Sequence, residues 1–175
     1  MSVRDALFDL DGTLYAIGNG LEDHVRERIF AFMVERLGVE DAALARGLWH
    51  VAFRRYNQSL RGLRACGYTF DSDEYWRFIR GDSARFLSPT PQVGALIRSL
   101  RDAGIRCWIF TNCREREAVE ALHALDLDPS LFAGVLGADF QARAGAAARS
   151  LVPDLDCACF CSETCASRRR RRSRA

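Results

Sequence analysis

The stretch FDLDGTLY, Phe8–Tyr15, places two aspartates one residue apart, directly behind a short apolar run. We predict a buried strand over Ala6–Leu10. Because side chains two residues apart on a strand point the same way, Asp9 and Asp11 would face one side together. Their like charges repel each other, so such a pair is expected where a cation lies between the carboxylates or where a reaction requires both. The DG pair is also typical of a hairpin turn, but the residues that follow read as helix and offer no partner strand.

Helical periodicity follows the acid pair. Apolar residues recur at three-and-four spacing, which predicts helices over three stretches: Leu21–Leu37, Asp41 to about Ala65, and Ser72–Ile79. We find no strand between Tyr15 and Ser88. Residues 16–88 are therefore predicted to form an all-helical insertion.

After SPTP, Ser88–Pro91, strands and helices alternate. The pattern predicts a helix, a strand, a helix and a short strand, at Gln92–Ala103, Arg106–Phe110, Glu115–Leu125 and Gly134–Leu136. Such alternation is typical of a parallel sheet covered by helices. We therefore predict an α/β fold with a Rossmann-like parallel sheet, built from residues 1–15 and 89–140 and interrupted by the helical insertion.

Polar residues gather where two predicted strands end. Loops at the carboxyl ends of parallel strands form the ligand crevice of such sheets. Asp9 and Asp11 would lie there, where a hard cation such as Mg²⁺ suits paired carboxylates. Thr111 and Asn112 would follow the second strand and offer donors to an anion at a helix start. Both are also ordinary helix N-cap residues, and that alternative stays open. Together the residues indicate phosphoryl transfer.

At this point the chain resembles the haloacid dehalogenase-like hydrolases, and within them the pyrimidine 5′-nucleotidase branch. The resemblance covers roughly residues 3 to 140 and rests on FDLDGTLY, GLEDHVRERIFAFMVERLG, RRYNQSLRGL, RCWIFTNCRERE and LDLDPSLFAGVLGADF. It implies a phosphomonoesterase in which Asp9 forms an aspartyl-phosphate and Asp11 is the general acid and base. Mg²⁺ would be held by Asp9 and Asp11, and Thr111 and Asn112 would hold the phosphoryl group.

The resemblance also makes the insertion, residues 16–88, a cap that closes over the site and selects the leaving group. In that role Asn57, Ser59 and Arg61 are candidate substrate contacts, with a solvated helix face as the alternative. The implied partner is a small-molecule phosphate ester, with pyrimidine nucleoside 5′-monophosphates among the candidates.

Two elements of the family pattern are not recognisable here. One is a lysine that neutralises the nucleophile and the phosphate. All 25 basic residues are arginines, so this role is either vacant or falls to an arginine such as Arg143 or Arg149. The other is a later pair of acids that completes the Mg²⁺ shell; the nearest are Glu163, Asp154 and Asp156. One lost transition-state contact costs about 10²–10³ in rate. The rival interpretation is a non-catalytic relative that binds phosphate or a partner.

Residues 141–175 form a divergent tail rich in cysteine and arginine, which we expect to be partly disordered. A truncated, mis-spliced or frame-shifted reading of a longer gene is the simplest explanation of this change. The alternating cysteines Cys157, Cys159 and Cys161 do not match zinc-knuckle spacing. The arginine run has no interleaved aromatic residues for base stacking, so we do not predict nucleic-acid binding.

The net charge and the hydropathy of the sequence limit the compartments and partners that we expect. The formal net charge is +2, but six of the 25 basic residues lie between Arg168 and Arg174, which leaves 19 basic against 23 acidic residues elsewhere. No apolar run approaches the ~20 residues of a membrane span. We expect a cytoplasmic protein, with the arginine run as an alternative nuclear address. An incomplete core would leave the first strand with an open edge, which makes a homodimer a candidate assembly.

Overall fold

The computed structural model describes residues 3–151, and side chains as far as residue 144. The predictions that concern Glu163, the clustered cysteines and the arginine run therefore lie outside the described residues. So do those for Asp154 and Asp156, and for the side chain of Arg149.

Three parallel strands form the sheet, in the order β1 (Asp5–Phe8), β2 (Arg106–Phe110) and β3 (Gly134–Leu136). Phe8 pairs with Ile109, which in turn pairs with Val135. The bounds of β2 and β3 agree with the prediction. β1 ends two residues earlier than predicted because the carbonyl of Leu10 accepts turn hydrogen bonds from the N–H groups of Thr13 (3.2 Å) and Leu14 (3.1 Å). The fold is α/β with a Rossmann-like parallel sheet, as the sequence predicted.

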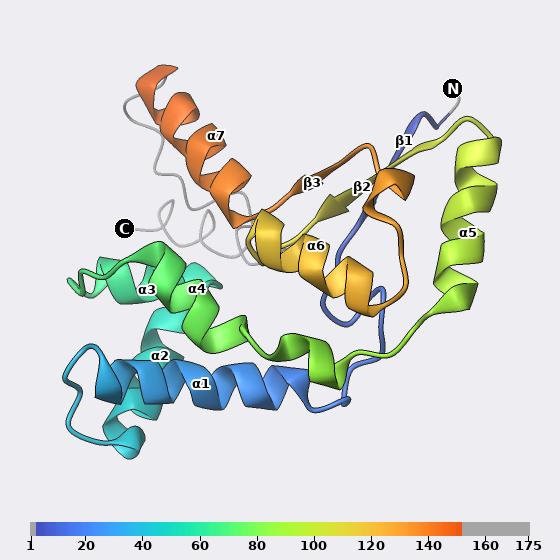
Figure 1. The fold of residues 1–175 in the computed structure, drawn as a ribbon. Coiled ribbons are helices and arrows are strands. Elements are labelled where there is room, and N and C mark those ends of the chain that lie inside the picture. The colour runs from blue at the N-terminus through green and yellow to red at the C-terminus, as the bar shows by residue number, and fades with distance from the viewer. Residues whose placement is uncertain (1–2, 152–175) are drawn as a thin grey trace, which may run out of the picture.

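Four helices lie between β1 and α5: α1 (Leu21–Glu35), α2 (Ala42–Tyr56), α3 (Ser59–Ala65) and α4 (Ser72–Arg80). We call them the helical block; Figure 1 shows it along one side of the sheet. The single helical stretch predicted over Asp41–Ala65 is wrong. Asn57 adopts a left-handed conformation, with φ of 49°, and its position ends α2 before α3 begins.

Three helices accompany the sheet: α5 (Pro91–Asp102), α6 (Glu115–Ala124) and α7 (Ala138–Leu151). α5 packs against β2, whereas α6 and α7 contact β3. Two short 3₁₀ helices, Ser83–Phe86 and Pro129–Leu131, lie in the connections. We did not predict α7 from the sequence, because we took the low apolar content after Gln141 as the start of a divergent tail. The alanine-rich sequence there has a high intrinsic helix propensity.

The apolar residues form two hydrophobic clusters. One lies around the sheet and includes Leu10, Ile97 and Ile109. The other lies inside the helical block and is rich in aromatic residues, among them Phe32 and Tyr75. Each part of the molecule therefore has its own core, which fixes the position of the loops between them.

β1 lies at one edge of the sheet within residues 3–151. Its apolar sequence is typical of a covered strand, yet Leu7 is 61% exposed and the preceding Val3 is 70% exposed. The open edge expected for an incomplete core is thus present in the described part of the chain. Among the same residues, no helix is both long and apolar enough to cross a bilayer.

Candidate active site

The two polar motifs converge at one edge of the sheet. β1 and β2 run in parallel with Phe8 opposite Ile109, so both strands end at the same edge. Asp9 and Asp11 follow β1 there, and Thr111 and Asn112 follow β2. The hairpin alternative for the DG pair is wrong, because the partner of β1 is β2 rather than the next segment of the chain.

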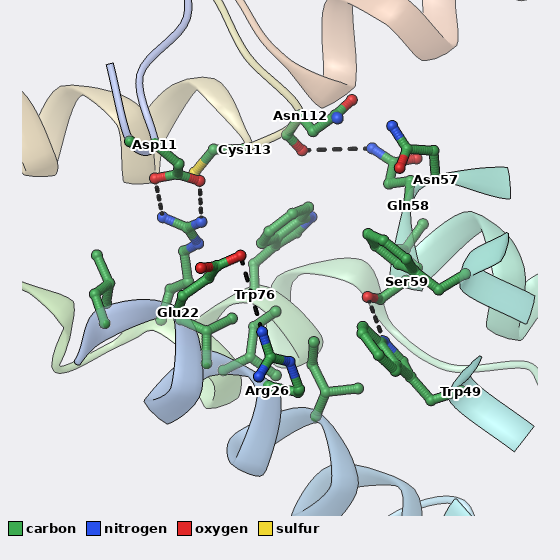
Figure 2. A pocket seen from close by; sticks show the side chains of 18 of the residues that line it. Asp11, Glu22, Arg26, Trp49, Asn57, Gln58, Ser59, Trp76, Asn112 and Cys113 are labelled. Carbon is green, nitrogen blue, oxygen red and sulfur yellow. Dashed lines mark hydrogen bonds and ion pairs between the residues drawn. The ribbon is translucent and has the colours of Figure 1, made fainter. Parts of the chain in front are cut away.

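A cavity of about 350 Å³ lies between this edge and the helical block. The loop after β1 contributes Asp11, Gly12 and Tyr15 to its lining. The helical block contributes aromatic side chains and a few polar ones, among them Trp49, Phe53, Trp76, Asn57, Gln58, Ser59 and Arg80. Figure 2 shows Asp11, Asn112 and Cys113 on one side of the cavity, and Trp49 and Ser59 across from them.

The structure brings four of the seven candidate site residues to the cavity. Asp11, Asn112, Asn57 and Ser59 line it, whereas Asp9, Thr111 and Arg61 are not among the lining residues. Asp9 is exposed two residues before Asp11, and Arg61 is exposed on α3. Thr111 is only 2% exposed and directly precedes Asn112.

Asp9 has an electrostatic environment that disfavours its charge. Partial desolvation of its carboxylate raises the pKa of Asp9, and the nearby charge of Asp11 acts in the same direction. The backbone N–H of Leu10 donates to the carboxylate and opposes these effects. Asp9 and Asp11 are therefore electrostatically coupled, as the sequence motif indicated.

Both carboxylate oxygens of Asp11 are engaged. Nη1 of Arg80 donates to Oδ1 at 3.1 Å, and Nη2 of Arg80 forms a close ion pair with Oδ2. The hydroxyl of Tyr15 also donates to Oδ1. Figure 2 shows the paired contacts of the guanidinium with Asp11 as dashed lines. Burial and the charge of Asp11 raise the pKa of Tyr15, so Tyr15 is a neutral hydrogen-bond donor.

Cys113 and Arg80 lie close enough to affect each other. Burial raises the pKa of Cys113 to about 12, so it is a neutral thiol at physiological pH. Burial alone would lower the pKa of Arg80, but Cys113 and Asp11 raise it more strongly. Because the thiol is neutral, Asp11 provides the opposite charge, and the guanidinium stays protonated.

Three hydrogen bonds hold the loop after β2: one lies within the loop, and two come from other parts of the chain. The N–H of Cys113 donates to Oγ1 of Thr111 at 3.1 Å, which is the turn contact expected of a residue at a helix start. The side-chain amide of Gln141 donates to the carbonyl of Thr111 at 2.8 Å. From the helical block, Gln58 donates to the carbonyl of Asn112 at 3.4 Å. The loop is thus fixed by α7 and by the helical block together.

Ser59 and Tyr75 are two of the polar residues that the helical block contributes to the cavity lining. The indole N–H of Trp49 donates to Oγ of Ser59 at 2.8 Å. Burial raises the pKa of the fully buried Tyr75, and a contact with the hydroxyl of Ser59 opposes this effect.

The described acids make only part of a metal site. Within residues 3–151 no group of three or more His, Cys, Asp or Glu side chains is arranged to hold a metal ion. Mg²⁺ in phosphate-binding sites typically uses one or two carboxylates together with water and phosphate oxygens. The Asp9 carboxylate fits this limited requirement. The side chain of Asp11 is already paired with Arg80.

Sequence reasoning missed Arg80 and the role of Tyr15. Arg143, the described arginine proposed for the missing cation, lies 4.0 Å from Glu115 and 71% of its side chain is exposed. A signal for Arg80 exists, because it follows Trp76 by four residues and therefore shares the cavity-facing side of α4. Tyr15 likewise follows Asp11 by four residues, within the motif itself.

The geometry defines an α/β protein with a ligand cavity at the carboxyl edge of a parallel sheet, closed on the other side by inserted helices. The family model of the haloacid dehalogenase-like hydrolases matches residues 6–152. The chain belongs to the haloacid dehalogenase-like hydrolase family. The resemblance seen in the sequence is confirmed at this level, and the matched region includes all of α7.

Proposed function

We propose that the protein hydrolyses phosphate monoesters through a covalent intermediate on Asp9. The observation that carries the proposal is the convergence of the Asp9-Asp11 pair with the Thr111 loop beside a cavity. Membership of a hydrolase family supports it. Phosphoester hydrolysis accounts for two acids that a purely structural turn does not require.

In the first step, a carboxylate oxygen of Asp9 attacks phosphorus, and the bond from phosphorus to the ester oxygen breaks. Asp11, in its protonated form, gives its proton to the departing oxygen. In the second step, Asp11 takes a proton from water, whose oxygen attacks phosphorus and releases Asp9 and inorganic phosphate. Asp11 acts in this way only when it leaves Arg80, so the arrangement described above precedes the reaction.

Thr111 and Asn112 are the proposed phosphate contacts. Asn112 lines the cavity. Thr111 accepts a hydrogen bond at Oγ1 and keeps its own hydroxyl hydrogen for donation. Both follow β2, where backbone and side-chain donors suit an anion.

Mg²⁺ is the proposed cofactor, held by the Asp9 carboxylate and the backbone carbonyl of Asp11. Such an ion, when bound, offsets the negative charge that otherwise keeps a carboxylate away from phosphate. We further propose that residues 1–15 and 89–140 form the core domain and that residues 16–88 act as its cap.

The cavity walls favour a flat leaving group. Trp49, Phe53 and Trp76 supply aromatic surface, and Asn57 and Ser59 supply hydrogen-bonding groups beside it. A nucleobase has this combination of ring and polar edge, so we propose pyrimidine nucleoside 5′-monophosphates as substrates. Arg61 lies outside the cavity lining and takes no part in this proposal.

Phosphate release from purified full-length protein tests the function. We expect turnover of p-nitrophenyl phosphate with Mg²⁺, loss of turnover with EDTA, and loss in Asp9→Asn by at least about 10³-fold. Uridine and cytidine 5′-monophosphate should be better substrates than adenosine 5′-monophosphate. Turnover that survives Asp9→Asn unchanged would contradict the mechanism, and equal rates with all three nucleotides would contradict the specificity.

A second candidate is a non-catalytic phosphate-binding protein. The specific observation in its favour is that both oxygens of Asp11 are occupied while Asp9 is not among the residues that line the cavity. This candidate predicts no phosphate release from any ester but a measurable heat of binding for inorganic phosphate. Calorimetry beside the turnover assay separates the two functions.

The proposed assembly is a homodimer in which two copies of β1 pair at their open edges. Unpaired strand edges readily pair with another chain, and here the edge carries the exposed side chain of Leu7.

A further inference from the structure

Arg80 is positioned to act on Asp11 from a distant part of the chain. It is the last residue of α4 in the helical block, 69 residues after Asp11. Its guanidinium meets both oxygens of the carboxylate, and only 11% of its side chain is exposed. Two parallel contacts of this kind fix both the position and the plane of a carboxylate.

The pair is sensitive to the loss of either partner. The Arg80 side chain is buried and the Asp11 side chain half-buried, so removing one partner leaves the other charge partly desolvated and without its counter-charge. Without Arg80, the charge of Asp11 would repel the carboxylate of Asp9 more strongly, because the two acids already repel each other. Arg80 thus determines how much negative charge the acid pair presents.

No other described cation lining the cavity serves Asp11. The chain has no lysine, and the cavity lining includes two arginines, Arg26 and Arg80. Arg26 pairs with Asp23 at 2.8 Å and Glu22 at 3.8 Å, both on its own helix. The positive charge at the acid pair therefore comes from Arg80.

The contact between Arg80 and Asp11 also leaves a polar atom of Arg80 unsatisfied. Nε of Arg80 is buried without a hydrogen-bond partner. Buried donors without acceptors are unfavourable, because they lose water and gain nothing in return. The unsatisfied Nε offsets part of the stabilisation that Arg80 gains from Asp11. A ligand can therefore displace Arg80 from Asp11 more easily.

We propose that Arg80 is a positioning residue that clamps the Asp11 carboxylate from the helical block, supplies its counter-charge, and competes with a divalent cation for the acid pair. The inference rests on the proposed function, because it takes Asp9 and Asp11 as the reacting acids. Use of Asp11 as general acid and base then requires Arg80 to release its side chain as the helical block moves, while the charge of Arg80 disfavours a divalent cation beside Asp9.

Calorimetric titration of the full chain with Mg²⁺ tests the competition. Arg80→Met should bind Mg²⁺ roughly tenfold more tightly than the wild type, because the variant lacks the positive charge that repels a divalent ion near the acid pair. Arg80→Lys should fall between them, because a lysine supplies the charge but not the two parallel contacts. A merely structural role for Arg80 would weaken binding or leave it unchanged.

Arg114→Met is the matched control. Arg114 also joins the helical block to the rest of the protein, through Asp73 of α4 and through Asp139 at 2.8 Å in α7, but it does not touch Asp11. Its loss should leave the affinity for Mg²⁺ as in the wild type. An equal gain in Arg114→Met, or no gain in Arg80→Met, would overturn the proposal.

A second measurement covers the case in which Arg80→Met does not fold. Asp11→Asn breaks the same pair from the other side, and Trp49 and Trp76 line the cavity as fluorescent probes. Acrylamide should quench tryptophan emission more strongly in Asp11→Asn than in the wild type, and unchanged quenching would overturn the clamp. Neither measurement requires turnover. A wild type without phosphatase activity would contradict the proposed function but would not affect these two tests of Arg80.

Discussion

Tyr15 donates a hydrogen bond to Asp11 from four residues further along the chain. Its hydroxyl donates to Oδ1, and the ring packs against the hydrophobic cluster at the sheet. A hydrogen bond to a charged group contributes about 1.5–3 kcal/mol. We therefore expect Tyr15→Phe to lower the free energy of unfolding by about 1–2 kcal/mol, measured by urea denaturation.

Tyr56→Phe is the control for this variant, because Tyr56 stacks with Arg55 at the end of α2 and does not reach Asp11. It should change stability by no more than about 0.5 kcal/mol. Equal effects of the two variants would show that the contact between Tyr15 and Asp11 contributes nothing of its own.

Asp5 joins β1 to β2 through side chains. Its carboxylate accepts hydrogen bonds from Arg106 and from the indole of Trp108, each at 2.8 Å. These contacts lower the pKa of Asp5, with Arg106 as the main cause. A lowered pKa in the folded state means that the stabilisation is present above the unfolded pKa, near 4, and is lost as the pH falls through the folded value.

Asp5→Asn should therefore destabilise the protein at pH 7, and its effect should shrink as the pH falls through the lowered folded-state pKa of Asp5. Urea midpoints measured across this range check the expectation. A destabilisation that stays constant with pH would mean that the carboxylate charge is not what the two donors recognise.

At the scale of helices, α2 and α3 pack very closely at Gly62. A Cβ at that position would lie 2.9 Å from the Cβ of Ala52 and 3.3 Å from its carbonyl carbon. Gly62→Ala should gain at most about 1 kcal/mol from helix propensity. It should lose about 1–3 kcal/mol from overpacking, so the net effect is destabilising.

Gly47→Ala provides the opposite case within α2. A Cβ there meets nothing within 4 Å, so the propensity gain of about 0.5–1 kcal/mol should appear undiminished. Thermal denaturation of both variants tests the pair. A stabilised Gly62→Ala would show that α3 shifts away from α2 at little cost.

The sequence specified elements whose signals are local. The apolar run at β2 and the periodicity of α1 predicted the observed elements, because burial of a strand or a helix face requires those patterns. The break at Asn57 depends on a single left-handed residue, which periodicity does not detect. Similarly, the sequence located Asp11 at the strand end, but its partner Arg80 comes from another helix and is fixed only by tertiary packing.

At the scale of the whole molecule, polar contacts join the helical block to the part of the protein that contains the sheet. Arg80 reaches Asp11, Gln58 reaches the carbonyl of Asn112, and Arg114 reaches Asp73. Among apolar side chains, Val25 packs against both clusters. Polar contacts exchange for water at lower cost than buried apolar surface, so this boundary suits a helical block that moves when ligands enter.

The proposed homodimer makes a prediction about the intact protein in solution. Leu7 is exposed on the edge strand β1, where a charged side chain would oppose pairing between two copies. Light scattering coupled to size exclusion should give twice the chain mass of 19.7 kDa for the wild type and the single mass for Leu7→Lys. Leu44→Lys, in an exposed position on α2, should remain dimeric. A wild type that is monomeric at all concentrations would exclude assembly through β1, and dissociation of Leu44→Lys would place the interface on the helical block instead.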